Sequence, residues 1–372
     1  FCEKLKLLGF REEDYIELGK HSYEVNKNTE LGERLSHYRN VAELFEDLCG
    51  GLSSVYDKNF DYKISRLESE AIYIRSIPNP QVQEGLKNNL QYTLDEGMST
   101  GRGFWIVPCG TGEYLNITPK EHKSIVESAV EIGKGKITIV AGCAGINPND
   151  VIDLVNQSEE AGAEYVMVPP PFYEALDEEA MCEWYRIIAE STNLGLVIYD
   201  QSWRVGLGTN LTLPIIDKLS NIDNVVSLKY GSPNIFNDTI VALEEFAPRF
   251  AFIDNSLGYL ASVSHMHGAT GWISGPSSWW PEFELGILDL LEDGKYKEAD
   301  KEHAKITPYM AKFHGEFWKA SKYWHNAAII KASLEYVGLT GGPVRPPFRE
   351  LNKDEKYELF NIMSDMEVKK KN

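Results

Sequence analysis

The feature that most constrains the fold of this chain is a regular alternation of short apolar runs with longer amphipathic segments, beginning near Glu70. Parallel strands need such crossover segments, and the apolar runs have the length and composition of buried strands. Eight runs fit this description: Ala71 to Ile77, Gly103 to Cys109, Ile137 to Gly142, Tyr165 to Val168, Leu194 to Asp200, Val225 to Lys229, Phe250 to Asp254 and Gly271 to Ser274. Eight such strands predict an α/β chain folded as a (β/α)8 TIM barrel. A doubly wound open sheet would also alternate, but it would not by itself account for eight strands before a helical tail.

Several of the intervening helices carry their own boundary signals. Thr118-Pro119-Lys120-Glu121 offers an N-cap residue, a proline in the first turn and a glutamate at the capping-box position. Asn147-Pro148-Asn149-Asp150 opens the following helix in a similar way, and Gly162 closes it. The sequence therefore predicts a helix after the second run and another after the third.

The segment before the barrel has a different pattern. Residues 1–69 contain amphipathic helical sequence, for example from Leu35 to Leu48, and no strand-like runs at regular spacing. We expect a helical N-terminal extension that docks on the barrel, residues 70–280, or on a neighbouring subunit.

We expect residues 281–372 to form a C-terminal helical region after the barrel. Helical patterns run from Pro281 to Phe313 and from Trp324 to Gly338, and the proline-rich segment from Thr340 to Pro347 predicts extended chain. We expect the closing Lys369-Lys370-Lys371 to be a solvated tail.

Charge and composition restrict the class of partner. A net charge of −19 disfavours nucleic acid and anionic membrane, and no stretch of eighteen apolar residues is present to span a bilayer. The five cysteines are scattered and none has metal-knuckle spacing, so we expect reduced thiols in a soluble cytoplasmic protein. Since the chain begins with Phe1 and no signal pattern opens it, we also expect a processed or trimmed form.

A lone lysine near the end of an apolar run is the first candidate for chemistry. Lys229 ends the run that begins at Val225, and the preceding run ends in a comparable way at Tyr199. Burying an ammonium without a partner costs several kcal/mol, so a buried lysine tends to become a neutral amine that can form an imine with a ketone. In the alternative, the lysine stem crosses apolar surface and its head reaches solvent or a carboxylate.

The ends of the other runs supply further candidates, because barrel active sites lie at the C-terminal ends of the strands. The second run leads into Gly110-Thr111-Gly112-Glu113, where small residues let backbone N–H groups approach a carboxylate and Thr111 adds a hydroxyl. A plain tight turn would have the same composition. Tyr173 follows the fourth run and Arg204 the fifth, and an arginine alone is equally compatible with a surface ion pair.

Taken together, these strand ends resemble the dihydrodipicolinate synthase and N-acetylneuraminate lyase family, the pyruvate-type class I aldolases. The resemblance covers Ala71 to Phe348, with these landmarks: Gly110 to Glu113, Ala141 to Gly145, Pro170 to Tyr173, Val197 to Asp200, Ser227 to Lys229 and Val344 to Pro347. It implies a Schiff-base lyase for pyruvate or a related 2-oxo acid, in aldol condensation or cleavage, without metal or organic cofactor. Two other hypotheses stay open: a dehydratase or hydratase-aldolase that uses the same imine, and a non-catalytic barrel with a binding or scaffolding role.

The resemblance also implies roles for individual residues. Lys229 would form the imine and Tyr199 would shuttle protons. Thr111, with the backbone amides around Gly110 and Gly112, would bind the carboxylate of the 2-oxo acid and pass protons with Tyr199.

Three more residues take roles at the edge of this site. Tyr173 would complete the proton relay from a neighbouring subunit, Arg204 would grip the carboxylate of a second substrate, and Ile273 would contribute to substrate binding. Members of the family are commonly tetramers of tight dimers, so the resemblance implies a homo-oligomer whose small-molecule partners are a 2-oxo acid and an aldehyde.

The chain departs from the family pattern at several of these positions. Gly110 stands where the family has a hydroxyl residue, Asp200 where asparagine is usual, and the bulky Trp203 lies between Tyr199 and the arginine. Trp279 and Trp280 replace smaller residues after the last run, and we expect them to form aromatic walls suited to a larger or flatter second substrate.

Overall fold

The computed structural model describes residues 80–372 except 174, 201, 203–209, 232–237, 257, 314–324 and 372. The first predicted strand, Ala71 to Ile77, and the predicted extension, residues 1–69, lie outside the described residues. In the described part, seven parallel strands form one sheet in sequence order: β1 (Phe104–Ile106), β2 (Thr138–Gly142), β3 (Tyr165–Val168), β4 (Gly195–Tyr199), β5 (Val225–Tyr230), β6 (Ala251–Asp254) and β7 (Gly271–Trp272). Each strand falls within one residue of a predicted run or inside it.

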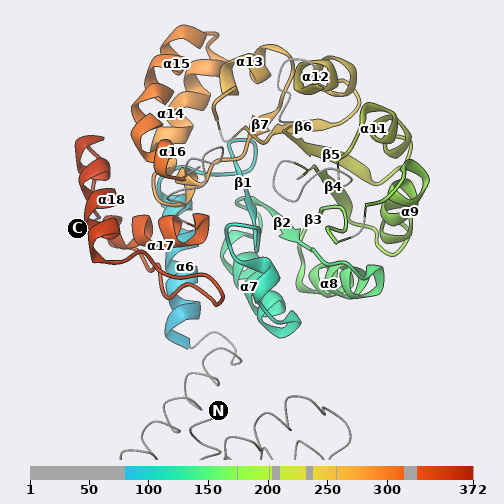
Figure 1. The fold of residues 1–372 in the computed structure, drawn as a ribbon, viewed down its shortest axis with the longest axis horizontal. Helices are drawn as coiled ribbons and strands as arrows, with labels where there is room; N and C mark the ends of the chain where they lie inside the picture. The colour runs from blue at the N-terminus through green and yellow to red at the C-terminus, as the bar shows by residue number, and fades with distance from the viewer. Residues whose placement is uncertain are drawn as a thin grey trace, which may run out of the picture. The chain divides into compact units, whose positions relative to one another are not determined.

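Helices connect the strands and lie along the outer side of the curved sheet, as Figure 1 shows for α7, α8, α9, α11 and α12. The helices of the barrel part are α6 (Pro80–Asp95), α7 (Pro119–Gly133), α8 (Pro148–Ala161), α9 (Glu178–Ala189), α11 (Leu213–Leu219), α12 (Ile240–Phe246) and α13 (Ala261–Met266), with the short 3-10 helix η1 (Tyr114–Asn116) after β1. A curved parallel sheet with outer helices is the TIM-barrel arrangement that the sequence predicts. None of the described helices is long and apolar enough to cross a membrane.

The predicted helix boundaries of α7 and α8 are confirmed. The Thr118 hydroxyl accepts a hydrogen bond from the backbone N–H of Glu121, whose carboxylate accepts one in return from the N–H of Thr118 at 2.7 Å. The side chain of Asn147 accepts from the N–H of Asn149, and α8 ends at Gly162 in a left-handed conformation with φ 93°. Glycine adopts that conformation without the steric cost that a Cβ would bring.

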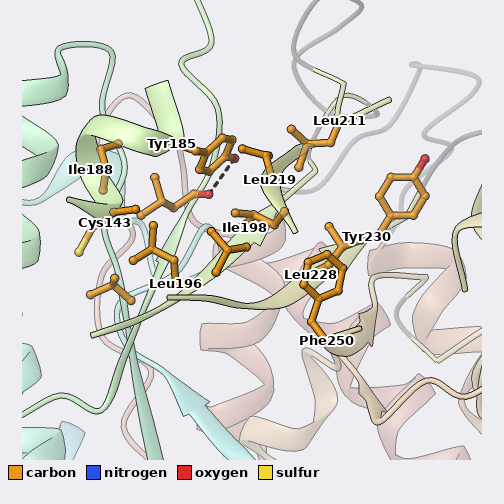
Figure 2. Packing of buried hydrophobic residues seen from close by; sticks show 14 of the residues in the cluster. Cys143, Tyr185, Ile188, Leu196, Ile198, Leu211, Leu219, Leu228, Tyr230 and Phe250 are labelled. Atoms are coloured by element: carbon orange, nitrogen blue, oxygen red, sulfur yellow. Dashed lines mark hydrogen bonds between the residues drawn. The ribbon is translucent and has the colours of Figure 1, made fainter. Parts of the chain in front are cut away.

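Alternation along the strands divides the buried side chains between two layers. Leu196, Ile198 and Leu228 point outward to the helices, as Figure 2 shows, and there the Tyr185 hydroxyl donates a hydrogen bond to the carbonyl oxygen of Val168. The intervening residues of the same strands, such as Tyr199, belong to a separate cluster on the inner face of the sheet. Because the period is two, the outward Leu228 places its neighbour Lys229 on the inner face.

The C-terminal helices are α14 (Pro281–Glu292), α15 (Tyr296–His303), α16 (Thr307–Phe313), α17 (Asn326–Val337) and α18 (Lys353–Asp365), with the short 3-10 helices η3 (Pro276–Ser278) and η4 (Ala304–Ile306). Helices α16, α17 and α18 share a hydrophobic cluster distinct from that of the barrel, whereas α14 and α15 pack in a smaller cluster with Ala261 of α13 and Trp272 of β7. Helices therefore occur where the sequence predicts them after residue 281, although the expected domain boundaries themselves stay a prediction.

The three lysines that follow α18 are exposed, as predicted for a solvated tail, and two of them also lie against aromatic rings. The Nζ atom of Lys370 lies 4.8 Å from the ring centroid of Tyr336 on α17, and that of Lys371 lies 3.3 Å from the ring of Tyr92 on α6. The backbone N–H of Lys371 also donates to the carbonyl oxygen of Val337 at 2.8 Å. The run of like charges is therefore solvent-exposed while two of its side chains contact aromatic faces.

Candidate active site

The candidate nucleophile lies against an aromatic ring on the neighbouring strand. β4 and β5 pair in parallel with Tyr199 opposite Lys229. The Nζ atom of Lys229 lies 3.7 Å from the centroid of the Tyr199 ring, and the two residues are 6% and 5% exposed. The face of a phenol ring attracts a positive charge, most strongly where water is excluded. Strand pairing alone therefore brings the two residues together.

The surroundings of the Lys229 amine bear on the two hypotheses that the sequence leaves open. Among the residues that the structure describes, this amine lies against the Tyr199 ring and forms no ion pair with a carboxylate. The residue is buried and lines the cavity described below. A carboxylate partner among the described residues is therefore disfavoured, and both a reactive amine and a head group that meets solvent in the cavity stay open.

A tight turn after β1 forms another part of the site. The backbone N–H of Glu113 donates to the carbonyl oxygen of Gly110 at 3.3 Å, and that of Tyr114 donates to the carbonyl oxygen of Cys109 at 3.2 Å. Gly112 has no room for a larger residue without adjustment, since a Cβ there would lie 3.2 Å from the backbone nitrogen of Cys109. The Sγ atom of Cys109 lies 3.1 Å from Oγ1 of Thr111, so a thiol stands beside the hydroxyl of the turn.

One cavity of about 980 Å³ joins the lysine to the turn and extends to both described edge strands, β1 and β7. Of the residues that the sequence predicts for the site, six line this cavity: Lys229, Tyr199, Thr111, Gly110, Gly112 and Ile273. A cavity of this size can accommodate a small organic acid together with a second reactant.

Of the other two predicted site residues, one lies at the surface and the other lies outside the described residues. Tyr173 lies at the surface after β3, 80% exposed, and does not line the cavity of its own chain. Its role in a neighbouring subunit stays a prediction. Arg204 lies outside the described residues, as does the neighbouring Trp203.

Asp200 accepts hydrogen bonds from Ser202 and Leu211 and does not line the cavity. One carboxylate oxygen accepts from the N–H and the hydroxyl of Ser202, and the other accepts from the N–H of Leu211 at 2.7 Å. Burial raises the pKa of the Asp200 carboxyl against the effect of these donors, which lower it. The carboxylate that departs from the expected asparagine therefore has protein donors on both of its oxygens.

The prediction that Trp279 and Trp280 form aromatic walls of the site is wrong. Trp279 is fully buried in the C-terminal cluster, with its ring centroid 4.8 Å from that of Tyr309. Trp280 stacks on Phe283 with centroids 4.3 Å apart, and neither tryptophan lines the cavity. A pair of tryptophans after a strand can pack outward as well as inward, and here the C-terminal helices supply the apolar partners.

The structure also reveals charged groups that the sequence analysis does not connect with the site. The carboxylate of Glu113, at the end of the turn, forms an ion pair with Lys331 of α17 at 2.5 Å and accepts from the backbone N–H of Arg345 at 2.7 Å. All three residues line the cavity. The sequence offers one indirect signal, a carboxylate within a glycine-rich turn, but no spacing rule links position 113 to positions 331 and 345.

The curved parallel sheet with outer helices makes this a TIM-barrel protein, and the buried lysine lies near the C-terminal end of a strand, where active sites of this fold are found. The chain belongs to the dihydrodipicolinate synthetase family, whose model matches residues 81–366. This is a family of pyruvate-dependent aldolases and synthases. The resemblance drawn from the strand ends is confirmed.

Individual relatives agree with this assignment. A 4-hydroxy-tetrahydrodipicolinate synthase of Methanothrix thermoacetophila is 26% identical over 289 residues, which cover 76% of this chain and 90% of the relative. The crystal structure of the chloride-inhibited dihydrodipicolinate synthase from Acinetobacter baumannii, complexed with pyruvate, matches with a TM-score of 0.68 and 20% identity, covering 77% of this chain and 93% of that one. A catalytic lysine mutant of the Ruminococcus gnavus sialic acid aldolase matches with a TM-score of 0.68 and 22% identity, covering 79% and 94%. These two structures share the fold of this chain.

Proposed function

We propose that this protein is a Schiff-base-forming lyase that uses Lys229 to bind pyruvate or a related 2-oxo acid for aldol condensation or cleavage. The observation that carries the proposal is the buried Lys229 amine, 3.7 Å from the Tyr199 ring, in the same cavity as the turn around Thr111. A family of pyruvate-dependent aldolases and synthases supplies independent support.

In the proposed reaction, the neutral Lys229 amine attacks the ketone carbon and forms a C–N bond. The ketone oxygen takes up two protons and leaves as water, which gives an iminium ion. Loss of a proton from the adjacent carbon gives an enamine, which attacks the carbonyl carbon of an aldehyde and forms the C–C bond as the aldehyde oxygen is protonated. Water then hydrolyses the iminium and releases the amine. Cleavage is the same sequence in reverse, and the iminium itself serves as the electron sink without a cofactor.

Tyr199 has two parts in this mechanism. Its ring face stabilises the positive charge of the iminium, and its hydroxyl transfers protons to and from the departing or attacking oxygen. A positioned group of this kind typically contributes about 10²–10⁴-fold to the rate.

The turn after β1 would bind the carboxylate of the 2-oxo acid. The backbone N–H groups around Gly110 and Gly112 and the hydroxyl of Thr111 are the donors, and the Cys109 thiol, 3.1 Å away, orients that hydroxyl. Because Gly110 has no hydroxyl, Thr111 is the one hydroxyl side chain that the segment Gly110 to Gly112 supplies for proton transfer.

The remaining roles concern a second substrate and the assembly. Ile273 would pack against the substrate, and Arg204 would bind a carboxylate of a second reactant. The exposed Tyr173 supports a role outside its own barrel, in the site of a neighbouring subunit of a cytoplasmic homo-oligomer.

The test is reductive trapping of the imine. The native chain and Lys229→Ala are incubated with pyruvate and borohydride, and the intact mass of each is measured. We expect a stable adduct on the native chain alone, located at Lys229 by peptide mapping. If pyruvate gives no adduct, larger 2-oxo acids are tested in the same way. Absence of an adduct with all of them would contradict the Schiff-base mechanism and favour a non-catalytic barrel. Once an adduct is found, turnover of aldehydes against turnover of hydroxylated 2-oxo acids separates an aldolase from a dehydratase.

A further inference from the structure

Glu113 combines backbone strain with a buried charge. It has φ 60° and ψ 29°, a left-handed conformation that is unfavourable for a residue with a Cβ. Its side chain is 4% exposed, and a carboxylate is stable in such a place only when it is paired. Strain of this kind persists where the surrounding structure fixes it, and it concentrates at functional sites.

The groups that fix Glu113 come from the C-terminal region. One carboxylate oxygen pairs with Nζ of Lys331, which also donates to the carbonyl oxygen of Pro343. The other oxygen accepts from the backbone N–H of Arg345. The guanidinium of Arg345 in turn donates to the carbonyl oxygen of Asn116 at 3.3 Å and to the buried carboxylate of Glu121 at 2.7 Å. The Glu113 carboxylate is therefore held from two directions.

These contacts act directly on the turn that carries Thr111. Glu113 is the residue after Gly112, and its backbone N–H closes the turn on Gly110. Because the side chain of Glu113 is anchored to Lys331 and Arg345, the left-handed residue cannot relax without breaking an ion pair and a hydrogen bond. The turn is thereby held in one conformation before any ligand binds.

We propose that Glu113, clamped by Lys331 and Arg345, is a positioning residue that preforms the carboxylate-binding turn of the site. The proposal rests on the function proposed above and adds to it that the C-terminal region determines the affinity for the carboxylate of the 2-oxo acid. Both oxygens of Glu113 are occupied by protein donors, so it acts through the turn and not by touching the substrate.

The test compares two ketones that differ in the carboxylate. Pyruvate and acetone both form an imine with a lysine, but only pyruvate uses the turn. For Glu113→Gln and for Lys331→Met we expect the half-saturating pyruvate concentration for borohydride trapping to rise about tenfold or more, since each change removes a charge-assisted contact. The trapping rate with acetone should stay within about twofold of the native value, since Lys229 and Tyr199 are untouched.

Two variants separate positioning from general destabilisation. Lys331→Arg retains the cation and should restore most of the pyruvate affinity. Glu335→Gln removes another ion pair of α17, the one with Lys356 on α18, and should leave both ketones unaffected. An unchanged half-saturating pyruvate concentration in Glu113→Gln, or an equal loss with pyruvate and acetone, would overturn the proposal. Absence of any adduct on the native chain would instead count against the proposed function.

Amide hydrogen exchange tests the clamp without any chemistry at Lys229. In Lys331→Met we expect peptides that contain residues 109–114 to exchange about tenfold faster or more, while those of β5 keep the native rate. Glu335→Gln should exchange as the native chain does. If the turn keeps its native exchange rate in both Lys331→Met and Glu113→Gln, the clamp does not hold it and the proposal is wrong, whether or not an imine forms.

Discussion

The two sides of the candidate site are built in different ways. Lys229 and Tyr199 lie opposite each other on adjacent strands, so the register of β4 and β5 is sufficient to bring them together. The turn around Thr111 depends instead on Lys331 and Arg345, which lie more than two hundred residues further along the chain. The proposed nucleophile is therefore positioned by strand pairing, and the proposed carboxylate site by tertiary ion pairs. Damage to the C-terminal region should affect substrate affinity before it affects the reactive amine.

The largest expected effect comes from a substitution at Lys229, which leaves the turn around Thr111 unchanged. Lys229→Arg keeps a long basic side chain beside the Tyr199 ring but cannot act as a nucleophile, because a guanidinium does not lose its charge in proteins. We expect complete loss of the borohydride-trapped adduct with little change in the midpoint of thermal unfolding, followed by intact mass and circular dichroism. An adduct on this variant would show that another lysine forms the imine.

Next in size is the effect of the Tyr199 hydroxyl. Tyr199→Phe keeps the ring beside Lys229 and removes the proton-transfer group, so we expect the rate of imine formation with pyruvate to fall about 10²-fold. Tyr199→Leu, which also removes the ring, should be slower still. If Tyr199→Phe traps pyruvate at the native rate while Tyr199→Leu does not, the ring and not the hydroxyl carries the role.

A double-mutant cycle measures how strongly the turn after β1 is coupled to α17. Glu113→Gln and Lys331→Met, alone and together, should give a coupling of about 1–2 kcal/mol in the free energy of unfolding, since the pair is largely buried. The matched cycle on the same helix uses Glu335→Gln and Lys356→Met, a more exposed pair for which about 0–0.5 kcal/mol is expected. Equal couplings from urea titrations would contradict a special role for Glu113.

The smallest effect concerns a second carboxylate that joins the C-terminal region to the barrel. Glu284 of α14 accepts from Nε1 of Trp272 and from the hydroxyl of Ser274, both neutral donors. Burial raises the pKa of this carboxyl above its ordinary value of 4.5. The folded protein thus retains a proton that the unfolded chain has lost, and stability from this group is lost as pH rises from 4.5 through the raised pKa.

Glu284→Gln removes this titration. The native chain should therefore lose stability relative to the variant as pH rises above 4.5, and the difference should level off once the carboxyl is ionised in both states. Urea midpoints of the two proteins, measured across this range, provide the check. A difference that grows in favour of the native chain with rising pH would mean that ionised Glu284 is the stabilising form.

The sequence predicts the strands of the barrel and the proximity of Lys229 to Tyr199, because both depend on local patterns. Period-two alternation places Tyr199 and Lys229 on one face, and the caps at Thr118 and Asn147 announce their helices. The role of Glu113 is not predictable in the same way, because its partners are fixed only by the packing of α17. The sequence likewise does not predict that Trp279 packs outward, because its apolar neighbours lie elsewhere in the chain.

The docked segment after α18 has a practical consequence for how this protein is handled. Lys371 contacts Tyr92 through its side chain and Val337 through its backbone, so it links α6 to the end of the helix that carries Lys331. An affinity tag or fusion partner joined directly at this point would lie close to both helices and could disturb these two contacts. A flexible spacer keeps the added segment away from α6 and α17.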